Sequence, residues 1–165
     1  MASITLKGNP VKTLGELPKV GTKAPAFSLT RNDLSQVSLQ DYQGKRKVLN
    51  IFPSIDTAVC ATSVRNFNKE AGNLSGTVVL NISADLPFAQ KRFCGAEGIA
   101  QAETLSTFRS TFAKDYNVGM ETSVLAGLCS RAVLVLDEND MVIYSEQVPE
   151  IAQEPNYEQA LKVLR

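Results

Sequence analysis

A cysteine at the start of a predicted helix is the residue best suited to chemistry. Cys60 follows a predicted buried strand at residues 47–52, which Pro53 ends. Apolar residues then recur at steps of three and four from Cys60 to Leu74, which predicts a helix. The first turn of a helix presents unpaired N–H groups and partial positive charge, so it favours the nucleophilic thiolate of Cys60. Alternatively, Cys60 is a small buried residue of the apolar stripe.

Three further residues favour the reactive interpretation. Thr57 lies three positions before Cys60, where its hydroxyl can reach the sulfur, although it also suits a helix N-cap. Pro53 would shield the sulfur from bulk water, although it also suits an ordinary turn. Arg131 stands directly before an apolar run at residues 132–136. Its guanidinium would stabilise the thiolate and donate hydrogen bonds to an incoming oxygen, unless it is a solvent-exposed charge at a sheet edge.

The composition argues against several other kinds of site. The chain has 165 residues and no histidine, so it cannot form a Ser-His-Asp or Cys-His catalytic pair. Its three cysteines, Cys60, Cys94 and Cys129, are widely spaced, which argues against a zinc site. The 17 basic and 17 acidic residues cancel, which argues against nucleic acid or an anionic membrane as a partner. We expect no metal and no cofactor.

Location and domain count follow from length and hydropathy. Residues 1–7 alternate between polar and apolar, unlike the continuous apolar region of a signal peptide. The run at residues 132–136 is far too short to cross a bilayer. We therefore expect a cytoplasmic protein whose residues 1–165 form a single domain.

The elements that position these residues follow from periodicity and turn signals. The first 14 residues predict a hairpin around Gly8-Asn9-Pro10. Strands are predicted at residues 26–29, 37–39, 47–52, 77–82, 132–136 and 141–148, and helices at 60–74, 87–93, 108–116 and 156–164. Because strands and helices alternate and the last two strands form a hairpin, the sequence predicts an α/β fold with a mixed central sheet and helices on both faces.

The motif around the cysteine resembles a known family. The pattern Pro53-x-x-x-Thr57-x-x-Cys60 resembles the active-site pattern of the peroxiredoxins. Longer runs, at residues 45–57, 82–90 and 92–98, are similar to one subfamily, the bacterial thiol peroxidases, which are atypical two-cysteine peroxiredoxins. The resemblance extends from Gly8 to Tyr157 and implies a thioredoxin-like fold with an N-terminal hairpin.

The resemblance also implies roles for individual residues. Cys60 would be the peroxidatic cysteine and Cys94 the resolving cysteine, with Pro53, Thr57 and Arg131 completing the active site. Cys60 would attack hydrogen peroxide or an alkyl hydroperoxide and become a sulfenic acid. Cys94 would then form an intramolecular disulfide with it, and thioredoxin would reduce that disulfide. The family further implies a homodimer that serves in antioxidant defence.

Disulfide geometry adds a condition to this cycle. A disulfide requires Cα atoms within about 7 Å of each other. Cys60 begins one predicted helix and Cys94 ends another, so the two thiols need not be adjacent in the reduced protein. We predict local unwinding around Cys60 and at residues 93–98, where Gly95 and Gly98 would lower its cost.

Two other functions remain open. A thioredoxin-like disulfide oxidoreductase would need a second cysteine at the position of Ser63, and a proline where Ser130 and Arg131 precede the late strand. A binding or chaperone module on this fold would leave Cys60 unreactive. Cys129 lies outside the family pattern; we expect a small buried residue there, the alternative being a third thiol that forms a wrong disulfide.

Overall fold

The structure, a computed structural model, describes residues 3–72, 74–98 and 103–165. Within these ranges a seven-stranded sheet has the order β4-β3-β7-β6-β5-β8-β9. Its strands are β3 (Ser28–Thr30), β4 (Gln36–Ser38), β5 (Arg46–Ile51), β6 (Thr77–Ser83), β7 (Glu103–Ser106), β8 (Ala132–Leu136) and β9 (Val142–Gln147). The interior strand β5 pairs in parallel with β6 and antiparallel with β8. The predicted mixed α/β sheet is therefore confirmed.

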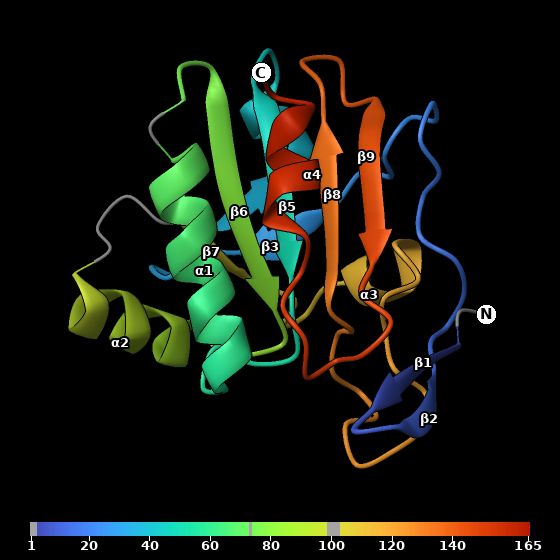
Figure 1. The fold of residues 1–165 in the computed structure, drawn as a ribbon. Coiled ribbons are helices and arrows are strands. Elements are labelled where there is room, and N and C mark those ends of the chain that lie inside the picture. Colours follow the sequence, from blue (N-terminus) through green and yellow to red (C-terminus); the bar gives the residue numbers. More distant parts are fainter. Residues whose placement is uncertain (1–2, 73, 99–102) are drawn as a thin grey trace.

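Helices cover both faces of the sheet, as expected (Figure 1). One face carries α1 (Ala58–Ala71) and α4 (Tyr157–Lys162), and the other carries η1 (Leu39–Tyr42) and α3 (Phe112–Asp115). Successive side chains of a strand point to opposite faces. Val48 accordingly packs in the cluster of α1 and α4, whereas Leu49 packs in the cluster of α3.

The predicted N-terminal hairpin is a separate two-stranded sheet of β1 (Ser3–Leu6) and β2 (Asn9–Lys12). Its turn lies at Lys7 and Gly8, with φ angles of 50° and 83°, one position earlier than the sequence motif suggested. In Figure 1 the hairpin lies below the main sheet, toward the end to which the arrow of β5 points. A bridge between Thr5 and Glu150 joins it to the C-terminal segment.

Several predicted boundaries were wrong. The helix α2 (Pro87–Glu97) runs past Gly95 and ends at Glu97, because the next residue, Gly98, takes the left-handed conformation that terminates a helix. The helix predicted at residues 108–116 is reduced to α3, because Arg109 has a positive φ of 65°. The helix α1 ends at Ala71, before Leu74. The strand β7 was not predicted, because four residues with three polar members carry little periodic signal.

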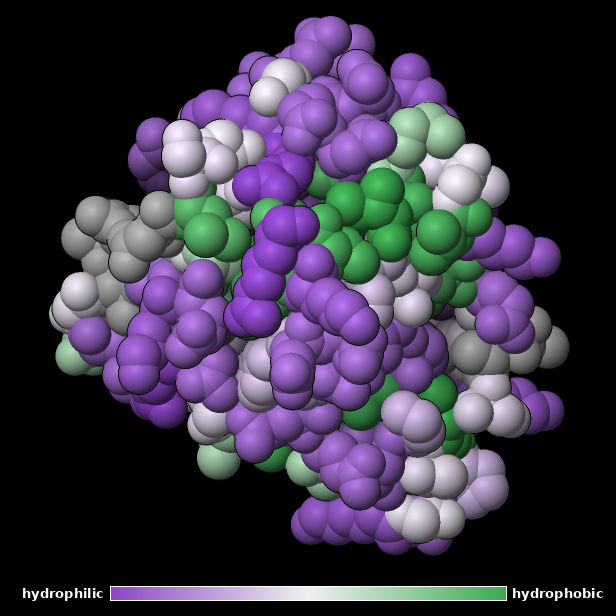
Figure 2. Space-filling view, turned by 45° about the horizontal axis from the view of Figure 1, so that its top comes forward, coloured by the Kyte–Doolittle hydropathy of each residue, from purple (hydrophilic) through white to green (hydrophobic). Residues whose placement is uncertain are grey.

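The face of the molecule drawn in Figure 2 is mostly polar. Figure 2 shows a hydrophilic face interrupted by a hydrophobic patch in its upper right half. Among the described residues, no helix has the length and apolar character needed to cross a membrane.

Candidate active site

Cys60 lies at the start of α1, in the segment that follows the C-terminal end of β5. β5 ends at Ile51, two residues before Pro53, and residues 53–57, here called the Cys60 loop, lead to Thr57 at the N-cap of α1. The Cys60 side chain is fully buried in a cluster with Phe52, Ile55 and Val64. As expected, Cys60 lies in the first helical turn, where backbone N–H groups lack helical partners, and its sulfur is a free thiol.

The guanidinium of Arg131 meets this sulfur directly. Arg131 Nη2 donates to Cys60 Sγ across 3.3 Å, and Nε donates to the carbonyl of Ile151 across 2.8 Å. The residue is 2% exposed, so the alternative of a solvent-exposed charge at the sheet edge is wrong. Nη1 is buried and has no hydrogen-bond partner among the described residues. The site therefore places the positive charge of the Arg131 guanidinium against the Cys60 sulfur. It also leaves Nη1 as a further hydrogen-bond donor next to that sulfur.

The backbone of Arg131 is fixed from the neighbouring strand. Gln147 of β9 donates from Nε2 to the Arg131 carbonyl across 2.9 Å and accepts from the Ser130 hydroxyl across 3.1 Å. The backbone N–H of Val148 donates to the same carbonyl. These bonds fix the backbone position of Arg131, and the bond from Nε to the Ile151 carbonyl fixes the orientation of its guanidinium.

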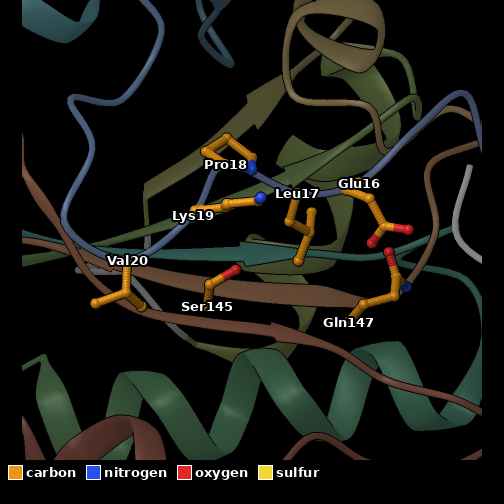
Figure 3. Close-up of a pocket in the computed structure, with 7 residues that line it drawn as sticks. All are labelled: Glu16, Leu17, Pro18, Lys19, Val20, Ser145 and Gln147. Atoms are coloured by element: carbon orange, nitrogen blue, oxygen red, sulfur yellow. The ribbon is translucent and has the colours of Figure 1, made fainter.

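A groove of about 490 Å³ lies on the outer side of Gln147. Figure 3 shows the segment at residues 16–20 running along β9, with Ser145 and Gln147 facing it. None of the predicted site residues lines this groove. The groove therefore lies outside the predicted site.

A second pocket, of about 460 Å³, opens at the start of α1 and next to Arg131, although the buried Cys60 does not itself line it. Three of the predicted site residues, Pro53, Thr57 and Arg131, line it. Most of the remaining wall is apolar and comes from the hairpin, the start of α1 and two late loops: Leu6, Ala58, Val59, Leu125, Leu128, Ile151 and Ala152. The pocket thus combines one buried cation with an apolar wall.

The hydroxyl of Thr57 takes a partner that the sequence did not suggest. Thr57 Oγ1 donates to the carbonyl of Ser54 across 2.9 Å. The hydroxyl does not cap α1, although Thr57 occupies the N-cap position. Its proton is therefore engaged within the Cys60 loop, while its oxygen still has lone pairs to accept a hydrogen bond in the pocket.

Cys94 lies on α2, away from the cluster that holds Cys60. Its Sγ is 3.8 Å from Thr104 Oγ1, and partial burial raises the pKa of its thiol, which keeps it protonated at neutral pH. Neither cysteine is in a disulfide. The structure therefore represents the reduced protein, with the two thiols on different helices.

Side-chain contacts dock α2 against the start of α1. The Phe93 ring packs on the cluster of Cys60, and the Arg65 guanidinium lies 5.8 Å from the centre of that ring. Arg65 also forms a two-bond ion pair with Glu97, at 2.7 and 2.9 Å. A second pair joins Arg92 to Asp56 across 2.9 Å. These contacts hold the helix of Cys94 in its reduced position.

Comparison with known proteins places this site in a family. The Redoxin family model matches residues 19–161. The chain belongs to the Redoxin family. The thiol peroxidases of Mycobacterium tuberculosis H37Rv and of Mycobacterium bovis are each 56% identical to it over 164 residues, 99% of either chain. These matches confirm the expected resemblance to thiol peroxidases and the expected enzyme class, a thiol-dependent peroxidase.

Solved structures agree with this Redoxin assignment. A peroxiredoxin-like protein from Aquifex aeolicus superposes with a TM-score of 0.94 at 36% identity, covering 99% of this chain and 96% of that one. A thiol peroxidase from Chromobacterium violaceum superposes with a TM-score of 0.92, with the same coverage, at 21% identity. The expected thioredoxin-like fold is thereby confirmed.

Cys129 is the third thiol of this Redoxin chain and is a core residue, as expected. It is 1% exposed and packs in the cluster that contains Phe112 and Tyr116. Burial raises the pKa of its thiol to about 12. The thiolate, which is the reactive form, is therefore scarce at physiological pH.

Sequence reasoning missed one acidic residue next to the site. Asp85 follows β6, and its carboxylate accepts hydrogen bonds from the Cys60 loop. The available signal was the parallel pairing of neighbouring strands, because the carboxyl ends of β5 and β6 then meet at one edge of the sheet. Within the described ranges, no cluster of three or more His, Cys, Asp and Glu side chains is placed to hold a metal ion.

Proposed function

We propose that this protein reduces hydrogen peroxide and alkyl hydroperoxides through a Cys60 sulfenic acid and a Cys60–Cys94 intramolecular disulfide, which thioredoxin reduces. The observation that carries the proposal is the hydrogen bond from Arg131 Nη2 to Cys60 Sγ inside a buried cluster. A guanidinium fixed against a first-turn thiol favours the thiolate, which is the form that attacks peroxide.

In the first step, the thiolate of Cys60 attacks the nearer peroxide oxygen. The S–O bond forms as the O–O bond breaks, and the sulfur loses two electrons to become a sulfenic acid. The leaving oxygen takes up a proton and departs as water or an alcohol. Arg131 Nη1 is available to donate to the oxygens, and the Thr57 oxygen is available to accept from the peroxide O–H.

The wall of the pocket supports alkyl hydroperoxides as substrates beside hydrogen peroxide. Leu6, Leu125, Leu128 and Ile151 line the space next to Arg131. An apolar wall gains free energy when it removes an alkyl group from water, at about 25 cal/mol per Å² of buried surface. Hydrogen peroxide has no alkyl group and would not share this gain.

In the second step, Cys94 would resolve the sulfenic acid. Its sulfur bonds to the Cys60 sulfur, and the sulfenic oxygen leaves as water with the thiol proton. The two thiols start on separate helices, so the first turn of α1 and residues 93–98 would unwind. Thiol–disulfide exchange with thioredoxin then returns both thiols.

We further propose a cytoplasmic homodimer of one-domain subunits that serves in antioxidant defence. Leu86, Phe88 and Phe108 are large apolar residues with exposed fractions of 50%, 64% and 42%. They lie in adjacent segments, because Thr107 N–H donates to the carbonyl of Ser83. An exposed apolar group of this kind suits a subunit contact. Sedimentation of a Phe88→Asp variant tests the dimer, and cell fractionation tests the location.

Peptide mapping tests the whole cycle. The reduced protein is treated with one equivalent of peroxide, and its thiols are mapped by non-reducing mass spectrometry. A dominant Cys60–Cys94 link supports the proposal, provided that Cys60→Ser abolishes peroxide consumption and the matched Cys129→Ser variant keeps it. If Cys60 stays a free thiol while peroxide remains, the proposed function is wrong. Insulin reduction without peroxide consumption would instead indicate a disulfide oxidoreductase.

A further inference from the structure

Three hydrogen-bond donors converge on the carboxylate of Asp85. Ser54 Oγ donates to Oδ1 across 2.7 Å, and the backbone N–H of Ile55 donates to Oδ2 across 2.7 Å. Ser83 Oγ also donates to Oδ2, across 2.6 Å. The first two donors belong to the Cys60 loop, whereas Asp85 itself belongs to the segment after β6. A side chain that only accepts hydrogen bonds suits this arrangement, as an ionised carboxylate does.

Asp85 is itself fixed from neighbouring elements. The hydroxyl of Ser106, on β7, donates to its backbone carbonyl. The hydroxyl of Ser83, on β6, donates to its carboxylate. Hydrogen bonds therefore hold Asp85 in place at the carboxyl end of β6, and its carboxylate in turn holds the Cys60 loop. Without the carboxylate, the loop would lose these two hydrogen bonds.

The same network reaches the helix that carries the second reactive cysteine. Gln90 is fully buried on α2, and its Nε2 donates to Ser83 Oγ across 3.1 Å and to the carbonyl of Leu105 across 3.0 Å. Cys94 lies four residues after Gln90 in this helix, and therefore on the same side of it. A continuous path thus runs from Ile55 through Asp85, Ser83 and Gln90 to the helix of Cys94.

We propose that Asp85 is a positioning residue that holds the Cys60 loop in the shape that attacks peroxide and must release it when the disulfide forms. The inference rests on the proposed function and adds a residue to it. Asp85 touches neither the sulfur nor the pocket; it acts through Ser54 and Ile55, which precede α1. Holding the loop favours the first step of the cycle, whereas releasing it favours the second.

Asp85→Asn is the sharpest variant, because it keeps the shape of the side chain and replaces one acceptor oxygen by a donor. At least one of the three converging donors then faces an NH₂ group. Losing a hydrogen bond to a charged group changes a rate on the order of tenfold. We expect the second-order rate of Cys60 oxidation to fall on the order of tenfold. We expect conversion of the sulfenic acid to the disulfide not to slow.

Rapid-quench mass spectrometry of the full-length protein measures both steps separately. Asp137→Asn is the matched control, because the Asp137 carboxylate accepts from the N–H groups of Asn139 and Met141 in the distant β8–β9 turn. The control variant should show both rates of the wild type. A Ser54→Ala variant adds a second test, because its effect should vanish once Asp85 is replaced.

The outcomes separate the two hypotheses. If Asp85→Asn oxidises at the wild-type rate, the positioning role is wrong although the peroxidase function stands. If both steps slow by the same factor, Asp85 only stabilises the fold, and the proposal is also wrong. If the wild type itself fails to consume peroxide, the proposed function fails. Additive effects of Ser54→Ala and Asp85→Asn would overturn the claim that the two residues act together.

Discussion

Arg131 donates a hydrogen bond to the sulfur of Cys60 across 3.3 Å, although the two residues lie 71 positions apart in the chain. One stands at the start of β8 and the other in the first turn of α1, and antiparallel pairing of β5 with β8 brings these ends together. The position of this charge next to the sulfur thus depends on the sheet, not on the helix of the cysteine. A chain without histidine can obtain thiolate stabilisation in this way.

Replacing Arg131 by lysine should cost most of the peroxidase activity. A lysine has one charged nitrogen, so it cannot bond Ile151 and Cys60 in the same fork geometry. Removing one preorganised donor lowers a rate on the order of a hundredfold, and we expect that loss in the second-order rate with hydrogen peroxide. Competition against a second peroxidase measures this rate. The exposed Arg109→Lys is the control, and equal rates for both variants would contradict the proposed role.

Cys129 should resist alkylation in the native protein. Burial raises the pKa of the Cys129 thiol to about 12, so the thiolate is scarce at pH 8. Iodoacetamide at pH 8 should therefore label Cys129 only after unfolding, and Cys129→Ser should keep the wild-type rate. Mass spectrometry of native and denatured samples provides the comparison. Native labelling of Cys129 would show that the core around it opens.

The ion pair between Arg65 and Glu97 should slow disulfide formation without affecting the first step. Glu97→Gln removes the charge that docks α2, so unwinding becomes easier. A surface ion pair contributes little to stability, so we expect the disulfide of the variant to form only about two to five times faster than that of the wild type. Rapid-quench mapping measures it, with Glu158→Gln on α4 as control. A slower disulfide would mean that the docked position of α2 assists the reaction.

The same pair predicts a dependence on pH. The hydrogen bond from Arg65 lowers the pKa of Glu97 below its usual 4.5. A depressed pKa gives stability that is present above the unfolded value and is lost as pH falls through the folded value. Docking of α2 should therefore be constant at neutral pH and weaken only below about pH 4.5. Hydrogen exchange of residues 87–97 at pH 7, 5 and 3.5 measures this, with Glu97→Gln showing no such change.

The pocket wall should distinguish large from small peroxides. Leu128→Ser removes apolar surface next to Arg131. Losing the contact with a methylene group of the substrate lowers kcat/KM for that substrate by about tenfold relative to a substrate without the group. We expect the kcat/KM for cumene hydroperoxide to fall by about that factor relative to the value for hydrogen peroxide, with the exposed Leu34→Ser as control. An unchanged ratio of the two kcat/KM values would place the alkyl group elsewhere.

The sequence predicted the parts of this site that depend on local pattern. Cys60 and Pro53 sit at a strand–helix junction that periodicity and helix-start signals locate well. Arg131 was suspected because a charge directly before an apolar strand is unusual. Its contact with sulfur needed the pairing of β5 with β8, which periodicity does not specify.

Other features depended on side-chain partners that no spacing rule could predict. From the sequence, the hydroxyl of Thr57 could reach the Cys60 sulfur or cap the helix. Only the turn geometry decides that it donates to the carbonyl of Ser54. In the sequence, Asp85 looks like an ordinary loop carboxylate. Only the parallel pairing of β5 with β6 shows that it lies opposite the Cys60 loop. The end of α2 was misjudged because Gly95 and Gly98 both suit a helix terminus, and only Gly98 has a positive φ.

The contacts that dock α2 have a consequence for survival under oxidative stress. In the proposed cycle, a sulfenic acid on Cys60 would persist for as long as Phe93, Arg65 and Glu97 hold the helix of Cys94 in place. A second peroxide that reaches the sulfur in that interval would oxidise it to the irreversible sulfinic acid. The Arg65–Glu97 ion pair would then help to set the peroxide concentration above which the protein is inactivated by its own substrate.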